Sequence, residues 1–317
     1  MKRISTLGAA GLLFSFSVAA SATPRDEGRF QLRILSYNVK GLPGIAGGYR
    51  NGERFEEIGR ELRAMKIAGQ APQIVLMQEA FVKATNEIRE FSGYEHTYKG
   101  PKASDPDEDG KSTLKLFNSG IVTLSDYPIV AAAKVAFGKG KCGTWDCFAN
   151  KGVQLSMIEI PELPFHLPVM NTHLQATRER NEDRIKQMGV IKRFMSRFLG
   201  PVQPLIFAGD FNTRPNSSSY DWFAKNMGLY NIGEICMKEI TRCVVAEGTP
   251  VDRLNVIDQH YAISGVAGDR GGSDAKYAVR IEPSRVEKTF TKLVKGKPLS
   301  DHLGYQVDYD ISWYRML

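Results

Sequence analysis

Leu205-Ile-Phe-Ala-Gly-Asp-Phe-Asn-Thr-Arg-Pro215 is a short apolar run that ends in a glycine, two polar residues and a proline. This pattern is typical of a buried strand that delivers polar side chains at its end. If the extended geometry continues, Asp210 and Asn212 point to the same side. There a carboxylate and an amide can orient water and bind an anionic oxygen. Taken alone, the stretch fits an Asx-rich turn after a strand equally well.

Other predicted strands also end in polar residues. The predicted strands include Gln31–Tyr37, Gln73–Met77, Pro168–Asn171 and Val256–Ile263. The polar residues at or near their ends are Asn38, Glu79, His173, Asp258, Asp301 and His302. A carboxylate directly after a buried strand is costly unless it is solvated, paired or bound to a metal. A hard cation held by oxygen atoms is therefore one interpretation of Glu79 and Asn38.

The N-terminus reads as a leader. Lys2 and Arg3 precede a mostly apolar stretch from Leu7 to Ala20, and the small residues 20–22 suit cleavage. We therefore predict a signal peptide over 1–22, a loose polar entry segment over 23–29, and a single catalytic domain over 30–317. The mature protein is expected to be secreted or periplasmic.

The composition fits a globular chain with ample material for a core. The 317 residues are 42% hydrophobic and 24% charged, with a formal net charge of +7. The leader contains two of the 42 basic residues and no acidic residue, so 7 minus 2 leaves +5. This charge favours encounters with phosphate-bearing partners, either nucleic acid or a membrane surface, without distinguishing them.

Four cysteines form two close pairs in the sequence, Cys142 with Cys147 and Cys236 with Cys243. In an exported protein these spacings indicate two short-loop disulfides, although pairing across the two sets stays open. Zinc binding is the alternative. Neither pair has Cys-x-x-Cys spacing or a neighbouring histidine, which disfavours it.

Two amphipathic helices are predicted, over Glu53–Ile67 and Arg178–Phe198, from apolar residues spaced three or four apart. The basic face of the second helix is expected to be solvated. The runs Asn118–Ser125 and Ile129–Phe137 are expected to form a hairpin across Asp126-Tyr-Pro. Asp146 and Lys151, five residues apart on a loop, form a surface ion pair in the simplest interpretation.

The candidate residues together indicate a reaction type. Two histidines, four acids and two amides lie near strand ends, without a plausible nucleophilic serine or cysteine motif. This set favours hydrolysis by water with the assistance of a metal. A histidine can deprotonate water if an aspartate fixes its tautomer.

The ordered set of motifs resembles the endonuclease/exonuclease/phosphatase superfamily over about residues 30–312. The motifs are Ser-Tyr-Asn38, Gln-Glu79, Asn-Thr-His173, Gly-Asp210-Phe-Asn212, Ile-Asp258 and Ser-Asp301-His302. The resemblance implies an α/β fold, a two-layer sandwich of packed mixed β-sheets flanked by helices (the deoxyribonuclease-like fold). It also implies a phosphodiesterase site at one edge.

Two details resemble the neutral, bacterial-type sphingomyelinase branch of that superfamily. They are Thr-His173-Leu-Gln175-Ala and Asp146-Cys-Phe-Ala-Asn-Lys151-Gly-Val. The resemblance implies an exported enzyme that hydrolyses sphingomyelin to ceramide and phosphocholine. It also implies that Asp146 and Lys151 act as a switch that supports the active site.

The resemblance assigns a role to each site residue. Mg²⁺, with Mn²⁺ or Co²⁺ as substitutes, would be held by Glu79 with Asn38 and Asp301. His302 would activate water and Asp258 would orient the ring of His302. His173 and Asn212 would contact the phosphoryl oxygens, and Asp210 would orient the site or relay a proton.

Two alternatives remain open at this point. The first is a secreted nuclease or another phospholipid or phosphodiester hydrolase, and the second is a catalytically silent lipid-binding protein. The expected partner is a sphingomyelin-containing membrane surface, nucleic acid is less favoured, and no protein partner is inferred. The three tryptophans, Trp145, Trp222 and Trp313, are scattered, and the sequence shows no exposed hairpin with paired tryptophans that would anchor the protein.

Overall fold

The computed structural model describes residues 26–44, 51–239 and 241–317. The predicted signal peptide and residues 23–25 of the predicted entry segment lie outside these ranges. None of the helices within the described ranges is long and apolar enough to cross a bilayer.

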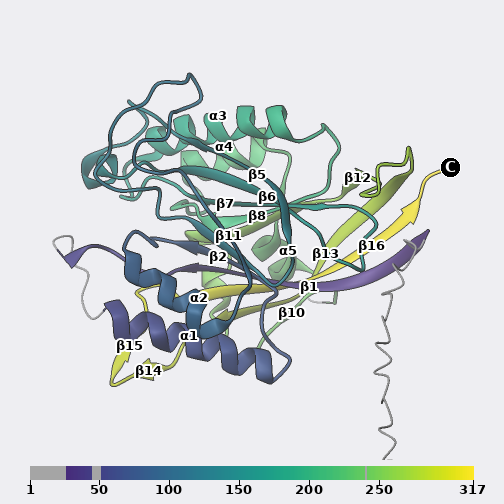
Figure 1. Ribbon diagram of the computed structural model, residues 1–317, viewed down its shortest axis with the longest axis horizontal. Coiled ribbons are helices and arrows are strands. Elements are labelled where there is room, and N and C mark those ends of the chain that lie inside the picture. Colours follow the sequence, from purple (N-terminus) through teal and green to yellow (C-terminus); the bar gives the residue numbers. More distant parts are fainter. Residues whose placement is uncertain (1–25, 45–50, 240) are drawn as a thin grey trace, which may run out of the picture.

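Two β-sheets pack face to face, and helices cover their outer faces (Figure 1). The first sheet has the order β10-β13-β16-β1-β2-β4-β3, and β12 pairs with β13. Its strands are β1 (Glu27–Asn38), β2 (Ile74–Gln78), β3 (His96–Lys99), β4 (Val122–Ser125), β10 (Val244–Val245), β12 (Gly265–Gly268), β13 (Lys276–Thr289) and β16 (Gly304–Arg315).

The second sheet has six strands in the order β5-β6-β7-β8-β11-β9. They are β5 (Ile129–Ala136), β6 (Gly152–Ile158), β7 (Leu167–His173), β8 (Leu205–Asp210), β9 (Tyr230–Asn231) and β11 (Asp258–Ile263). A separate small hairpin joins β14 (Leu293–Val294) to β15 (Lys297–Pro298).

The helices divide between the two outer faces. α1 (Asn51–Ile67) and α2 (Asn86–Ser92) lie on the first sheet, whereas α3 (Asn181–Phe198) and α4 (Ser218–Asn226) lie on the second (Figure 1). α5 (Ile232–Lys238) contacts β11 and β13. The predicted α/β sandwich of two packed mixed sheets flanked by helices is thus confirmed.

Alternation along the strands explains why the fold has three layers of apolar packing. On β1, Leu32 and Ile34 point into the core between the sheets, whereas Leu35 and Tyr37 point toward α1. On β7, Val169 faces the other sheet and Met170 faces α3. Both faces of the central strands are therefore buried, which is why their sequences are nearly continuous apolar runs.

The hairpin predicted across Asp126-Tyr-Pro is wrong. β4 pairs with β2 and β3 in the first sheet, whereas β5 pairs with β6 in the second. The short connection carries the chain from one sheet to the other, so the two strands are neighbours in sequence but not in pairing. The short connection was predicted correctly, but the pairing of the two strands that it joins was not.

The entry segment predicted over 23–29 is also partly wrong. β1 begins at Glu27, and Glu27 to Arg29 pair with the end of β16. These residues are polar because this end of the ribbon is exposed to solvent. The antiparallel partner strand, rather than a buried face, holds them extended.

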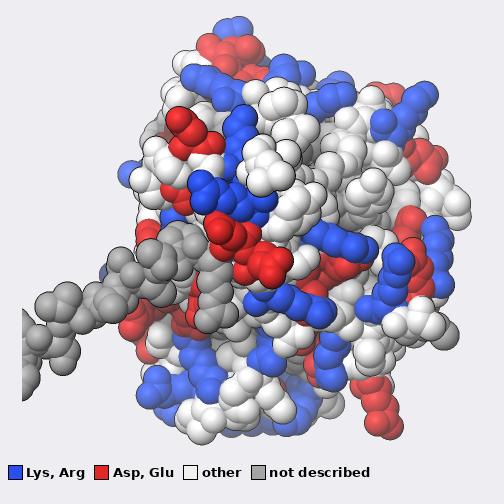
Figure 2. All heavy atoms as spheres, turned by 90° about the vertical axis from the view of Figure 1, so that its right-hand side faces the viewer, with Lys and Arg blue, Asp and Glu red and all other residues white. Residues whose placement is uncertain are grey.

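Two short loops are closed by disulfides, one between Cys142 and Cys147 and one between Cys236 and Cys243. The face at the right-hand side of Figure 1 carries basic and acidic side chains interspersed (Figure 2). The excess of positive charge is therefore not gathered into one patch on that face.

Gly209 sets the close approach of β8 to β7. Its φ is 154°, and a Cβ atom there would lie 2.2 Å from the backbone oxygen of Thr172. Only glycine fits this position, directly before Asp210.

We expect Gly209→Ala to lower the free energy of unfolding by about 1–3 kcal/mol, because the added methyl group separates the two strands. Urea unfolding followed by circular dichroism measures this change. Gly200→Ala is the matched control, since a Cβ atom there meets nothing within 4 Å. Equal stability of the two variants would contradict the packing constraint.

Candidate active site

The candidate residues converge because the strands that carry them end at the same edge. His173 closes β7, Asp210 closes β8 and Asp258 opens β11, and Asp210 is the register partner of both other residues. The three side chains therefore form a row across the second sheet. Asn38, at the end of β1, brings the first sheet to the same place.

Asn38 joins the two sheets. It is fully buried, and its amide nitrogen donates to Oε1 of Glu79 and to Oδ2 of Asp210, each at 3.0 Å. Its own Oδ1 accepts the backbone N–H of Lys40. Two carboxylates thus converge on one amide nitrogen at the junction of the sheets.

Glu79 follows β2 in a left-handed turn with a φ of 55°. Burial raises the pKa of its carboxyl group, and the hydrogen bond from Asn38 opposes that shift only in part. The half-buried carboxylate of Glu79 beside the buried one of Asp210, with a neutral amide between them, is costly unless a cation compensates it. This environment fits a hard divalent cation held by oxygen atoms.

His302 is held by Asp258. Nδ1 of the ring lies 2.9 Å from Oδ2 of Asp258, and Nε2 lies 3.9 Å from Oδ2 of Asp210. Burial lowers the pKa of the ring, but the carboxylates of Asp258, Asp210 and Asp301 outweigh burial and raise the pKa to about 10. When no cation is bound, the imidazolium therefore supplies positive charge to these three acids.

The ligand atoms of Asp210, Asp258 and His302 lie within 4.8 Å of one another and form a second group that can hold a metal. Oδ1 of Asp258 is buried and has no hydrogen-bond partner among the described residues. The cation-binding capacity of the site is thus spread over both the Glu79 side and the His302 side.

Asp301 pairs with Lys40 instead of contacting the other predicted metal ligands among the described residues. Its side chain is about half exposed, and its Oδ2 pairs with Nζ of Lys40 at 2.7 Å. Burial raises the pKa of Asp301, but Lys40 and His302 lower it overall. No direct contact joins Asp301 to Glu79 or Asn38 within the described ranges, so its place in a metal site stays a prediction.

His173 is buried beside Asp210, with Nε2 3.6 Å from Oδ2 of that residue. Burial, with Lys151 adding to it, lowers the pKa of the ring to about 3. The imidazole is therefore neutral near pH 7. Nζ of Lys151 lies 3.1 Å from Nε2, and Nδ1 is buried without a hydrogen-bond partner among the described residues.

Lys151 connects the loop of Asp146 to the site. Its Nζ lies 2.8 Å from Oδ2 of Asp146 and 3.0 Å from the backbone oxygen of Leu174. Because Lys151 is buried, the surface ion pair of the simplest interpretation is wrong. The structure instead joins Asp146, Lys151 and His173 into one chain of contacts.

Asn212 departs from the expected extended geometry. β8 ends at Asp210, and Asn212 has a φ of 52°. Its amide nitrogen donates to the backbone oxygen of Leu174 at 3.2 Å, and its backbone N–H donates to Oδ1 of Asp210 at 3.0 Å. Asn212 therefore stays near Asp210 through a turn and not through strand alternation.

Arg184 is a supporting residue that the sequence analysis missed. It lies on the basic face of α3, yet it is buried and donates to the backbone oxygens of Gln175, Thr177 and Arg178. The expectation that this face is solvated is wrong at this position. The loop after His173 provides the acceptors, and nothing in the helical pattern identifies them.

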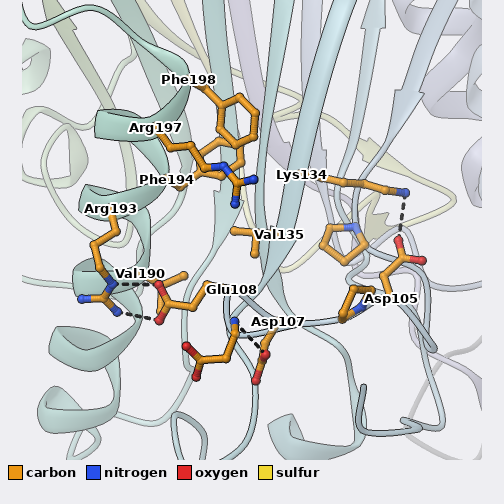
Figure 3. A pocket seen from close by; sticks show the side chains of 13 residues that line it. Asp105, Asp107, Glu108, Lys134, Val135, Val190, Arg193, Phe194, Arg197 and Phe198 are labelled. Carbon is orange, nitrogen blue, oxygen red and sulfur yellow. Dashed lines mark hydrogen bonds and ion pairs between the residues drawn. The ribbon is translucent and has the colours of Figure 1, made fainter. Parts of the chain in front are cut away.

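A cavity of about 930 Å³ lies elsewhere, between α3, β5 and the loop over 105–109 (Figure 3). None of the candidate site residues lines it. Its charges are largely paired within the cavity, Arg193 with Glu108 and Lys134 with Asp105. Cavity size therefore does not mark the reactive centre.

Fold and site together define a class of protein: a two-sheet α/β sandwich with an acid- and histidine-lined site where both sheets end. Residues 35–302 match the Endonuclease/Exonuclease/phosphatase family, and the chain belongs to that family.

One curated relative is Sphingomyelinase C 2 of Leptospira interrogans serogroup Icterohaemorrhagiae serovar Lai (strain 56601). It is 27% identical over 207 residues, which are 60% of this chain and 32% of the relative. This chain thus spans about a third of the length of that relative.

Solved structures share the fold at low sequence identity. Sphingomyelinase C from Streptomyces griseocarneus has a TM-score of 0.60 at 18% identity, covering 88% of this chain and 99% of that one. A mutant beta toxin from Staphylococcus aureus with bound magnesium ions has a TM-score of 0.59 at 15% identity, with coverage of 88% and 99%. D. rerio TDP2 with a single-strand DNA product has a TM-score of 0.58 at 16% identity, with coverage of 88% and 98%.

We expect Lys151→Met to lower turnover of a soluble phosphodiester about 10- to 100-fold, as is typical when a group that orients site residues is lost. The variant leaves Asp146 and His173 without the donor they share. Hydrolysis of bis(4-nitrophenyl) phosphate in the presence of Mg²⁺ measures the effect. Lys139→Met, an exposed change on the neighbouring loop, is the control. Turnover within twofold of wild type for Lys151→Met would contradict the role.

Proposed function

We propose that this protein is an exported Mg²⁺-dependent phosphodiesterase that hydrolyses sphingomyelin to ceramide and phosphocholine. The observation that carries the proposal is the meeting of Asn38, Glu79 and Asp210 beside the His302–Asp258 pair. Membership of the family and the likeness to sphingomyelinase C 2 support the reaction class and the substrate.

The roles follow from the contacts. Glu79, Asn38 and Asp301, the residue before His302, would hold Mg²⁺. Nε2 of His302 accepts the proton of the attacking water, while Asp258 holds Nδ1 and stabilises the imidazolium that results. A bound Mg²⁺ supplies positive charge that stabilises the phosphoryl oxygens and the leaving alkoxide and favours the neutral ring.

The remaining residues bind and orient the phosphate. In this proposal the amide of Asn212, which donates to the backbone oxygen of Leu174 in the protein alone, and the ring of His173 would contact phosphoryl oxygens. Asp210, between Asn38, His173 and His302, holds these three side chains in one arrangement. The water oxygen bonds to phosphorus opposite the ceramide oxygen as the bond from phosphorus to that oxygen breaks. The ceramide alkoxide takes a proton from solvent, and phosphocholine and ceramide leave.

An exposed apolar surface supports a membrane as the partner. We call it the apolar ridge, and it consists of Leu114, Leu116, Trp145 and Phe148. Leu114 and Trp145 are each 83% exposed, and large exposed apolar side chains in a group mark interaction sites. Trp is also the residue type that favours the membrane–water interface.

The apolar ridge joins two segments of the chain, and its residues Trp145 and Phe148 lie on the segment that carries Asp146 to the site. The backbone N–H groups of Leu116 and Phe117 donate to the backbone oxygen of Phe148 at 2.9 and 3.0 Å. Asp146 sits between Trp145 and the disulfide-bonded Cys147, and it binds Lys151. A bilayer that contacts the ridge would therefore lie close to the residues that support His173.

We expect sphingomyelin vesicles to release ceramide in the presence of the protein and Mg²⁺, EDTA to abolish the release, and added Mg²⁺ to restore it. Glu79→Ala and His302→Ala should each lower the rate by several orders of magnitude, because each removes a group needed for the chemical step. Glu90→Ala, on an exposed side chain of α2, is the control. Near-wild-type rates in either site variant would refute the assigned roles, and faster nicking of plasmid DNA would favour a nuclease.

We expect the double variant Leu114→Ser, Trp145→Ser to lower the ratio of vesicle turnover to soluble-diester turnover about tenfold or more, since it removes two side chains that can insert at the interface. Co-sedimentation with sphingomyelin vesicles in EDTA measures binding without hydrolysis. Ile67→Ser, equally exposed at 82% at the end of α1, is the matched control. An unchanged ratio and unchanged sedimentation would exclude the ridge as the docking surface.

A further inference from the structure

A cavity of about 370 Å³ adjoins the candidate site, and the assigned roles explain only part of its lining. His302, Asp258 and Asp301 line it, but so do Lys288, Arg253 and Arg214. These three cations come from separate segments: β13, the short 3-10 turn Val251–Arg253, and the loop after β8. No step of the proposed hydrolysis uses them.

Lys288 is the unusual member of this group. Lys288 is only 7% exposed, and its Nζ lies 4.0 Å from the centre of the Tyr305 ring. No hydrogen-bond acceptor contacts this ammonium group within the described ranges. Burial lowers its pKa to about 8, and the charge of Arg253 contributes to the lowering. A buried ammonium group without an acceptor is costly, and the cavity is where an acceptor can enter.

Arg253 and Arg214 are exposed at the same cavity, and neither guanidinium forms an ion pair within the part of the chain that the structure describes. The acids around them are mostly engaged. Asp258 binds His302, and Asp301 binds Lys40. Among the acids that line the cavity, this leaves Asp252 and the second oxygen of Asp258, which acts on Lys288, to balance three cations.

We propose that this cavity is a subsite for a second phosphate group on the molecule that carries the scissile phosphodiester. The proposal rests on the proposed phosphodiesterase function for the position of the scissile group. It also goes beyond that function, because sphingomyelin carries a single phosphate. Substrates with a neighbouring phosphate would use contacts that sphingomyelin leaves idle.

The chemistry of the lining matches a phosphate. A phosphate oxygen gives Lys288 the acceptor that it lacks, and a guanidinium can bind two phosphate oxygens at once. Phosphate charge also offsets the repulsion between Arg253 and Lys288. The shared wall formed by His302 and Asp258 places such a group directly beside the reacting centre.

A competing role for Lys288 is to balance the charge of Asp258, whose carboxylate raises the pKa of the lysine. In that case the lysine would support His302 and would affect every substrate to the same extent. The two roles differ in one observable, the preference between matched substrates with and without a second phosphate.

The experiment compares thymidine 3′-(4-nitrophenyl phosphate) with its 5′-phosphorylated form, in Mg²⁺. We expect the wild-type protein to prefer the 5′-phosphorylated substrate in kcat/KM, and we expect Lys288→Met to reduce this preference about tenfold, as is typical for the loss of a hydrogen bond to a charged group. Lys288→Arg should retain most of the preference. A wild-type preference near one, or a preference unchanged in Lys288→Met, would overturn the proposal.

Two further variants separate local effects from damage to the fold. Arg253→Ser changes an exposed residue and should reduce the preference without lowering the melting temperature. Arg285→Met removes an exposed cation from the same strand, where it pairs with Glu287, and should leave the preference intact. A loss of preference in Arg285→Met equal to that in Lys288→Met would show a long-range charge effect and would contradict a built subsite.

A second matched pair identifies the source of the phosphate. Vesicles of phosphatidylinositol and of phosphatidylinositol 4-phosphate repeat the comparison with a lipid headgroup. If the lipid pair shows the larger Lys288-dependent preference, the second phosphate belongs to a lipid headgroup; if the nucleotide pair does, it belongs to a nucleotide. If no diester is hydrolysed, the proposed function fails, and calorimetric binding of thymidine 3′,5′-bisphosphate against thymidine 3′-monophosphate decides this proposal alone. Equal affinities, or a difference that Lys288→Met leaves unchanged, would overturn it.

Discussion

The hydrogen bonds from the Asn38 amide to Glu79 and Asp210 are the contacts on which the site depends. The bond to Asp210 crosses from the first sheet to the second at the edge where both end, and the bond to Glu79 ties in the residue that follows β2 of the first sheet. The same nitrogen draws the half-buried carboxylate of Glu79 and the buried one of Asp210 together, which creates a need for positive charge. Lys151 and His302 supply positive charge in the protein alone, and a divalent cation fits the same environment. One side chain therefore links the meeting of the two sheets to the chemistry of the site.

Much of the fold could be predicted from local sequence patterns, because central strands buried on both faces leave nearly continuous apolar runs. The failures were in pairing and in exposed ribbons. The connection over 126–128 looks like a hairpin turn, and only tertiary packing shows that it links different sheets. β13 was not predicted, since charged residues fill its exposed face and a bulge near Pro283 interrupts its alternation. The long partner strand β16 stabilises it.

The site residues were predicted from polar residue types at strand ends, and the structure brings most of them together. Their exact partners could not be predicted. Asn212 reaches the site through a left-handed turn, and Asp301 turns to Lys40, because loop geometry decides both. Lys288 was missed because a lysine in an exposed-looking strand gives no sign that its side chain is buried. Burial of a single charged residue is a property of the assembled sheets and not of the strand.

The site draws on residues from position 38 to position 302, so it exists only when both sheets have formed and met. A fragment that lacks β1 loses Asn38, and a fragment that lacks the segment before β16 loses Asp301 and His302. A partly folded chain is equally inactive, because the acids that attract a cation are then far apart. A protein that crosses a membrane as an unfolded chain would thus carry no hydrolytic hazard for the cell that makes it, and would become active only at its destination.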